Sequence, residues 1–360
     1  MKIVHAVYSL EMGGAEVLVA QLCRFQRTNG HTVAVCVYST LGKLGVALRA
    51  DGFHIEVLGE AHPAVTLWRY FQVFRRLRPD VVHCHNPAPT LQAAVGARLA
   101  GASCVVSTRH SLVNPPYDVA AEVKYSVFCR TCDWIVGICD ATCDNLRHAP
   151  LARRARVVRI YNGVNPLEPV VSSDYPPKSG FTLIFVGRFA EVKDLKILIR
   201  AVGQALPSVP DIQLWLVGDG PTRPELEDLT ARLHLSNHVT FWGQRHDVAR
   251  FFSAADLFVM TSLSEGLPMA LLQAMSVGLP ALVTDIGGMA EVVRLCQCGI
   301  LVPIGDVAAT AMAIIELAGD PERRTVYGVQ AAAAYRAHFT LEQMAAAYMK
   351  LYRCTRPRAS

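Results

Sequence analysis

Residues Thr261–Glu291 read TSLSEGLPMALLQAMSVGLPALVTDIGGMAE, and this stretch decides the fold. An uncharged strand is predicted over Leu257–Met260, followed by a serine-rich turn that ends in Glu265-Gly266-Leu267-Pro268. Helix-forming residues run from Met269 to Met275, and a second apolar strand is predicted over Ala281–Thr284. Strand, glycine-containing turn, helix and strand make up the repeating unit of parallel α/β sheets. The turn before such a helix presents free backbone N–H groups to an anion.

The same alternation of short apolar strands and amphipathic helices covers the whole chain, which predicts an α/β protein with parallel sheets. Two series of strands are expected, separated by a proline-rich segment. The first series is Ile3–Tyr8, Thr32–Tyr38, His54–Leu58, Val81–His85, Cys104–Thr108, Trp134–Ile138 and Arg156–Ile160. The second series is Phe181–Val186, Leu214–Val217, Val239–Phe241, Leu257–Met260, Ala281–Thr284 and Gly299–Val302.

This division predicts two Rossmann-like, doubly wound domains, with boundaries at residues 1–164 and 181–340. The segment Asn165–Gly180 is proline-rich and strand-poor, so it is interpreted as the linker. Residues 341–360 are expected to form a final helix, Leu341–Tyr352, that crosses back to the first domain, followed by a tail. Ligands bind at the carboxyl ends of the strands in such sheets. One central cleft is expected if those edges face each other.

Charged and polar side chains follow the strands of the second series. Arg188 comes after the first strand, and Lys193 stands five residues later at a helix start. Two fixed cations at one strand edge can stabilise the charge that develops on a leaving diphosphate. Glu265 can accept hydrogen bonds from sugar hydroxyls, and Gln273 follows two helical turns later. The pair can hold two parts of one extended polar ligand.

At this point the chain resembles the retaining, two-domain glycosyltransferases of family four, which have the GT-B fold. The resemblance rests on the EGLP turn, on the segment Val186–Asp194 (VGRFAEVKD) and on nearly the whole alternation of strands. It implies that Arg188, Lys193 and Glu265 are catalytic residues. Arg188 and Lys193 are expected to hold the donor diphosphate, while Glu265 faces the sugar. The family has a second glutamate eight residues on, where this chain has Gln273.

The resemblance assigns further residues to the active site. It implies that His110, in the segment STRHS, is an active-site residue on the side of the first domain. His83 and His85 are interpreted as supporting or structural histidines. The expected donor-binding residues are Gly13, Gly14, Asn162, Arg188, Lys193, Gly243, Gln244, Arg245, Glu265, Gly266, Leu267, Pro268 and Gln273.

The implied reaction is the transfer of a sugar, of the hexosyltransferase type, from a nucleoside-diphosphate sugar to a hydroxyl acceptor with retention of configuration. Cell-envelope or exopolysaccharide synthesis is the expected setting, with a saccharide or lipid-linked acceptor. No cofactor and no metal are expected, because the sequence contains no Asp-x-Asp pair to hold a cation on the diphosphate. Two alternatives stay open: a GT-B-like sugar-nucleotide epimerase, and a non-catalytic homologue that binds sugar nucleotides, which Gln273 alone supports.

Composition and local sequence pattern bear on the partner, the location and the role of the cysteines. The formal net charge of +5 is too small to indicate a nucleic-acid partner. The N-terminus resembles a strand rather than a signal peptide, so we expect a cytoplasmic protein. The helix around Val65–Leu77 carries Trp68 among arginines; it is either a half-buried helix or a contact with the inner membrane surface. The four cysteines from Cys129 to Cys143 are interpreted as buried thiols, with a zinc site as the lesser alternative.

Overall fold

The computed structural model divides the chain into two units, each built around one parallel sheet. Unit 1 is Met1–Gly163 with Leu341–Ser360, and unit 2 is Val164–Thr340. The structure describes residues 1–113, 118–149, 156–168, 170 and 176–354. Residues 169 and 171–175 of the predicted linker, and 355–360 of the predicted tail, therefore lie outside the described residues.

Unit 1 contains a seven-stranded sheet in the order β3-β2-β1-β4-β5-β6-β7 within the described residues, and every paired strand is parallel to its neighbour. Its strands are β1 (Lys2–Val7), β2 (Thr32–Val37), β3 (His54–Val57), β4 (Val81–His85), β5 (Cys104–Arg109), β6 (Trp134–Gly137) and β7 (Val157–Arg159). Its helices are α1 (Gly14–Thr28), α2 (Gly42–Ala50), α3 (Pro63–Leu77), α4 (Pro87–Leu99), α5 (Val119–Phe128), the short 3-10 turn η1 (Cys129–Thr131), α6 (Asp140–His148) and α14 (Leu341–Arg353).

Unit 2 contains a six-stranded parallel sheet in the order β10-β9-β8-β11-β12-β13, again for the part of the chain that is described. Its strands are β8 (Thr182–Val186), β9 (Gln213–Val217), β10 (Val239–Gly243), β11 (Leu257–Met260), β12 (Ala281–Thr284) and β13 (Gly299–Val302). Its helices are η4 (Glu191–Lys193), α7 (Leu195–Ala205), α8 (Arg223–Arg232), α9 (Val248–Ala254), α10 (Met269–Ser276), α11 (Gly287–Cys296), α12 (Val307–Gly319) and α13 (Pro321–His338).

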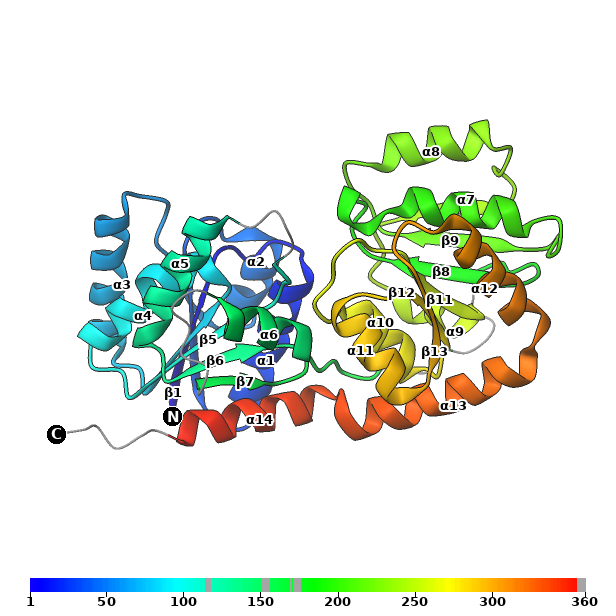
Figure 1. Cartoon of the computed structure of the whole chain (residues 1–360). Coiled ribbons are helices and arrows are strands. Elements are labelled where there is room, and N and C mark those ends of the chain that lie inside the picture. The colour runs from blue at the N-terminus through cyan, green and yellow to red at the C-terminus, as the bar shows by residue number, and fades with distance from the viewer. Residues whose placement is uncertain (114–117, 150–155, 169, 171–175, 355–360) are drawn as a thin grey trace. The chain divides into compact units, whose positions relative to one another are not determined.

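Helices cover both faces of each sheet, as expected for strands that are apolar along their whole length (Figure 1). In unit 1 the two faces form separate cores. Val4 and Ala6 of β1 belong to one core, whereas Val7 belongs to the other, because successive side chains of a strand point to opposite faces. All thirteen predicted strands are present within a residue or two of the predicted bounds, so the doubly wound α/β prediction is confirmed.

Local signals fix several helix ends. His62 caps α3 through Nδ1, which accepts from the Ala64 N–H at 3.4 Å, and Pro63 occupies the first helical position. Asp306 caps α12 by accepting from the Ala309 N–H at 2.8 Å. Among the described residues, no helix is both long and apolar enough to cross a bilayer.

Candidate active site

The carboxyl ends of β8 and β11 form the centre of the candidate site in unit 2. These two strands are neighbours, with β9 and β10 on one side and β12 and β13 on the other, so the strand order reverses between them. Ligands of open α/β sheets bind at such a reversal. The turn after β8 carries Arg188 and Lys193, and the turn after β11 carries Glu265. The three residues therefore lie at the place where a ligand is expected.

Lys193 and Glu265 form an ion pair across the two turns. The Lys193 Nζ contacts Glu265 Oε1, and the two side chains are only 18% and 12% exposed. Ser262 Oγ donates to the same carboxylate oxygen at 3.0 Å. The backbone joins the turns as well, because the Leu263 N–H donates to the Val192 carbonyl at 2.8 Å. The structure thus brings two of the predicted catalytic residues into direct contact.

The backbone beside Lys193 is held in a conformation that side chains rarely adopt. Asp194 has φ of 45°, in the left-handed region, and its carbonyl accepts from Thr261 Oγ1 at 3.1 Å. Burial raises the pKa of the Asp194 carboxyl above its usual value. A non-glycine residue persists in this region only when its surroundings hold it there, and such residues concentrate at functional sites.

Arg188 lies at the same edge but is exposed, and it makes no ion pair with any residue that the structure describes. Its turn is fixed by its neighbours rather than by its own side chain. The Phe189 N–H donates to the Asp219 carbonyl at 2.9 Å. Gly218 packs so closely that a Cβ there would collide with the Gly187 carbonyl. The glycines of the Gly218–Gly220 turn are therefore required for this close approach.

Gly243, Gln244 and Arg245 follow β10 at the same edge of the sheet. The Gly243 carbonyl accepts from the Gly218 N–H at 2.8 Å, which joins a third turn to the site. Gln244 and Arg245 are exposed, and the Arg245 guanidinium donates to both carboxylate oxygens of Asp247 at 2.9 and 2.7 Å. Arg245 is therefore neutralised locally, whereas Arg188 has no such partner among the residues that the structure describes.

The EGLP turn itself is well anchored. The Gly266 carbonyl accepts from the Gly288 N–H at 2.7 Å, and Leu267 is 3% exposed. Pro268 is the N-cap of α10 and makes no side-chain capping bond. Gln273 lies in the second turn of α10 and is partly exposed. The helix start therefore has backbone N–H groups without an intrahelical acceptor, as the sequence predicted.

In unit 1, Gly13 and Gly14 follow β1, the strand at which that sheet reverses its order. Helix α1 begins at Gly14, with Gly13 as an uncapped N-cap. The Glu16 carboxylate occupies the space that a Cβ on Gly13 would take, and burial raises the pKa of Glu16. Asn162 is buried and follows β7, the edge strand, four places from β1 in the sheet. Three strands therefore lie between the strand that precedes Asn162 and the strand that precedes the two glycines.

His110 follows β5 and is partly exposed. Its backbone N–H donates to Asn86 Oδ1 at 3.0 Å, and its Nε2 is hydrogen-bonded to His85 Nδ1 at 3.0 Å. Burial lowers the pKa of His110 to about 4, so the imidazole is neutral at neutral pH. The preceding Arg109 forks onto Glu122 with two bonds of 2.7 Å, which fixes the end of the strand. His110 therefore accepts or donates a hydrogen bond as a neutral ring.

Several residues at these edges were not predicted. Ser262 contacts Glu265, and only its place in the serine-rich turn could have indicated it. His5 lies opposite His83 in the pairing of β1 with β4, so the strand order would have placed it in the histidine cluster. The Trp242 indole N–H, next to Gly243, is buried and has no acceptor among the described residues.

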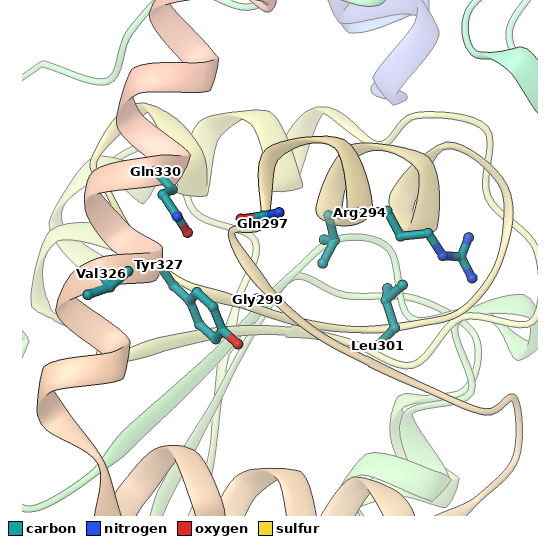
Figure 2. Close-up of a pocket in the computed structure, with 8 residues that line it drawn as sticks. Arg294, Gln297, Gly299, Leu301, Val326, Tyr327 and Gln330 are labelled. Carbon is teal, nitrogen blue, oxygen red and sulfur yellow. The ribbon is translucent and has the colours of Figure 1, made fainter.

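A possible metal group and a hollow in unit 2 are also candidate sites. Of the described residues, the one group spaced for a metal ion is His5, His83 and His85; Cys129, Cys132, Cys139 and Cys143 are buried thiols. A hollow of about 550 Å³ lies between α13 and the α11–β13 segment. Figure 2 shows Tyr327 and Gln330 projecting from α13 on one side of it. It is lined by Gly299, where β13 begins, so it lies away from the carboxyl ends of the strands.

Comparison with known proteins agrees with this geometry. Residues 12–167 match the family described as Glycosyltransferase Family 4, and residues 180–320 match the one described as Glycosyl transferases group 1. The putative glycosyltransferase EpsD of Bacillus subtilis is 30% identical over 263 residues, which cover 68% of each protein. The chain belongs to the group 1 glycosyltransferases. We therefore interpret the EGLP turn, Arg188 and Lys193 as features of a glycosyltransferase of that family.

Two further proteins are similar to this chain. The lipopolysaccharide core biosynthesis glycosyltransferase LpsD of Rhizobium meliloti is 32% identical over 201 residues, and the match spans 57% of its length. The structure of HepE from Anabaena in complex with UDP superposes with a TM-score of 0.85 at 20% identity, covering 97% of this chain and 99% of HepE. HepE has also been solved with UDP-glucose. The fold is GT-B, which confirms the predicted fold class.

Proposed function

We propose that this chain is a retaining glycosyltransferase that moves a sugar from a nucleoside-diphosphate sugar to a hydroxyl acceptor, in the synthesis of a cell-envelope or exopolysaccharide glycan. The observation that carries the proposal is the arrangement at the carboxyl ends of β8 and β11. There Arg188, a cation without an ion pair among the described residues, lies at the same edge as the Lys193–Glu265 pair. The names of LpsD and the UDP complexes of HepE support the acceptor class and the donor class.

The chemistry of the site fits a donor diphosphate without a metal ion. Arg188 and Lys193 place two cations at this edge, the second of them paired with Glu265, and the backbone N–H groups at the start of α10 add dipoles of the same sign. The sequence holds no Asp-x-Asp pair to carry a divalent cation. We therefore propose metal-independent transfer, with Arg188 and Lys193 stabilising the leaving group and Glu265 contacting the sugar.

The direct test is turnover with a panel of uridine, guanosine and adenosine diphosphate sugars, with release of the nucleoside diphosphate as the readout. Product configuration, determined by NMR, decides between retention and inversion. Arg188→Ala should abolish most of the release, while Arg232→Ala is the matched control, because Arg232 is an exposed arginine of unit 2 at the far end of α8. The proposal would be overturned if the wild-type protein neither bound nor turned over any donor of the panel.

We further propose that unit 1 contacts the cytoplasmic surface of a membrane that carries a lipid-linked acceptor. On α3, Trp68 is 60% exposed and Val65 is 42% exposed, and the exposed Arg75 makes no ion pair with any described residue. An exposed aromatic beside a free cation suits an anionic interface. Trp68→Ala should weaken co-sedimentation with phosphatidylglycerol vesicles severalfold, and Val329→Ala in unit 2 should not. Equal binding by wild type and Trp68→Ala would contradict this contact.

A further inference from the structure

A chain of hydrogen-bonded side chains leads from the interior of unit 1 to His110. Gln26 Oε1 is bonded to His5 Nε2 at 2.8 Å, and His5 Nδ1 is bonded to His85 Nε2 at 2.9 Å. His85 Nδ1 is then bonded to His110 Nε2 at 3.0 Å. Gln26 comes from α1, His5 from β1 and His85 from β4, so three elements contribute. The last nitrogen, His110 Nδ1, is buried and has no partner among the described residues.

Each imidazole of the hydrogen-bonded series, His5, His85 and His110, is neutral at neutral pH. Burial lowers the pKa of His5 and of His110 to about 4 and holds the pKa of His85 well below its usual value. A neutral imidazole has one N–H and one bare nitrogen, and which nitrogen carries the proton depends on the partner of the other. Every ring in the chain must therefore donate in the same direction.

The amide at the inner end sets that direction. In the arrangement with the Gln26 carbonyl oxygen toward His5 and the Gln26 Nε2 without a partner among the described residues, that oxygen can only accept, so His5 carries its proton on Nε2 and leaves Nδ1 bare. His85 then donates from Nε2 to His5 and leaves its own Nδ1 bare. His110 donates from Nε2 to His85, and its buried Nδ1 keeps a free lone pair. An unsatisfied buried acceptor is costly, so a ligand hydroxyl that donates to it is favoured.

We propose that Gln26, His5 and His85 are positioning residues that fix His110 in the tautomer protonated on Nε2, so that Nδ1 accepts a hydrogen bond from a hydroxyl of the transferred sugar or of the acceptor. This inference rests on the proposed function for the identity of the hydroxyl. The tautomer itself is a property of unit 1 and does not depend on that function.

A metal ion is the competing occupant of this cluster. Ligand atoms of His5, His83 and His85 lie within 4.8 Å of one another. However, His83 Nδ1 is bonded to the Tyr352 hydroxyl at 2.7 Å, and its Nε2 to Thr108 Oγ1 at 2.8 Å. All six ring nitrogens of the three histidines are therefore hydrogen-bonded, and a metal held by all three would have to displace at least one hydrogen bond of each ring. The hydrogen-bonded chain is the arrangement that the structure favours.

The test uses the full chain labelled with ¹⁵N-histidine, because protonated and bare ring nitrogens differ in ¹⁵N chemical shift. In wild type, His110 should show a bare Nδ1. Gln26→Met removes the acceptor with little change of shape, and His110 should then show a mixture of both tautomers, although Gln26 does not touch it. His85→Phe should change the ¹⁵N chemical shifts of His110 further. Tyr70→Phe is the control, because Tyr70 is fully buried in the same unit and its hydroxyl has no hydrogen-bond partner among the described residues, so the His110 signature should stay unchanged.

Kinetics with UDP-glucose, or with whichever donor the panel identifies, give the second readout. Gln26→Met should lower kcat about twofold and His85→Phe on the order of tenfold, with KM nearly unchanged, because the donor nucleotide binds in unit 2. Should His85→Phe fail to fold, Gln26→Met alone decides.

An unchanged His110 signature in Gln26→Met, or one equivalent of tightly bound zinc in the purified protein, would overturn the inference. A wild type with the expected tautomer but no turnover would overturn the proposed function alone.

Discussion

Breaking the Lys193–Glu265 pair tests the candidate site most directly, because the pair links the turns after β8 and β11. Because Lys193 stands in a turn at the edge of the sheet, its removal would by itself be expected to have little effect on folding. The structure changes this expectation, because both side chains are largely buried and each is the counter-charge of the other. Lys193→Met leaves Glu265 with the Ser262 hydroxyl as a partner, whereas Glu265→Gln leaves a partly buried ammonium with no counter-charge.

The expected magnitudes follow from burial. Removing one member of a fully buried pair costs about 3–5 kcal/mol, and a surface pair contributes about 0–1 kcal/mol. At 18% and 12% exposure this pair lies between the two limits, so each single variant should lose about 1–3 kcal/mol of unfolding free energy. Loss of the Lys193 or the Glu265 contact with the transition state should lower turnover by about 10²-fold or more.

The double variant Lys193→Met/Glu265→Gln separates a coupled pair from two independent residues. It leaves no buried charge uncompensated, so it should be more stable than Glu265→Gln alone, and its kcat/KM should be lowered by far less than the product of the single effects. Thermal unfolding and donor turnover are the assays. Lys178→Met is the control, because it breaks a more exposed pair with Asp256 in the same unit and should leave turnover unchanged. Additive losses in both assays would refute the coupling.

Four further outcomes are expected. Arg188→Ala should lower turnover about 10²-fold without shifting the unfolding temperature, because Arg188 is exposed and unpaired among the described residues; a loss of stability would show a structural role. Transfer should persist in excess EDTA, and a complete loss restored by magnesium would contradict metal independence. Gln273→Glu should tighten UDP binding modestly and keep turnover within about tenfold, whereas activity gained only in this variant would indicate a degenerate binding homologue. The free energy of unfolding should be highest above pH 6.5 and should fall as the pH drops toward 4, by about 1.4 kcal/mol per pH unit for each of His5 and His110, because the unfolded chain binds those protons at a higher pH than the folded protein. Calorimetry from pH 7 to 4.5 measures this change, and a flat profile would contradict the buried neutral histidines.

The strands were predictable because their signal is local. Val81–His85, Leu257–Met260, Ala281–Thr284 and Gly299–Val302 have the predicted bounds, since each apolar run is bordered by residues that end a strand. Parallel connection by helices then places every strand's carboxyl end at one edge of its sheet. For this reason the sequence could place Arg188 and Glu265 at the same edge, although 77 positions separate them.

The contacts within the site were not predictable in the same way. That Lys193 turns back onto Glu265 depends on the left-handed backbone of Asp194, and nothing in the residue pattern requires a positive φ at an aspartate. The histidine chain needed the pairing of β1 with β4, which sets His5 opposite His83, and the position of Gln26 on α1. Pairings of this kind depend on tertiary packing, whereas periodicity reports only which face of an element is buried.

The two sheet edges differ in the kind of chemistry that they offer. In unit 2 the edge carries formal charges, with Arg188 unpaired among the described residues and Lys193 within reach of the same turns. In unit 1 it carries imidazoles that burial keeps neutral, ending in the lone pair of His110 Nδ1. A charged edge discriminates phosphate from hydroxyl, because only the phosphate regains the cost of desolvating a cation. A neutral acceptor in a buried position discriminates in the opposite sense, because it favours an uncharged donor hydroxyl over an anion. The proposed substrate, a diphosphate joined to a sugar, contains one group of each kind.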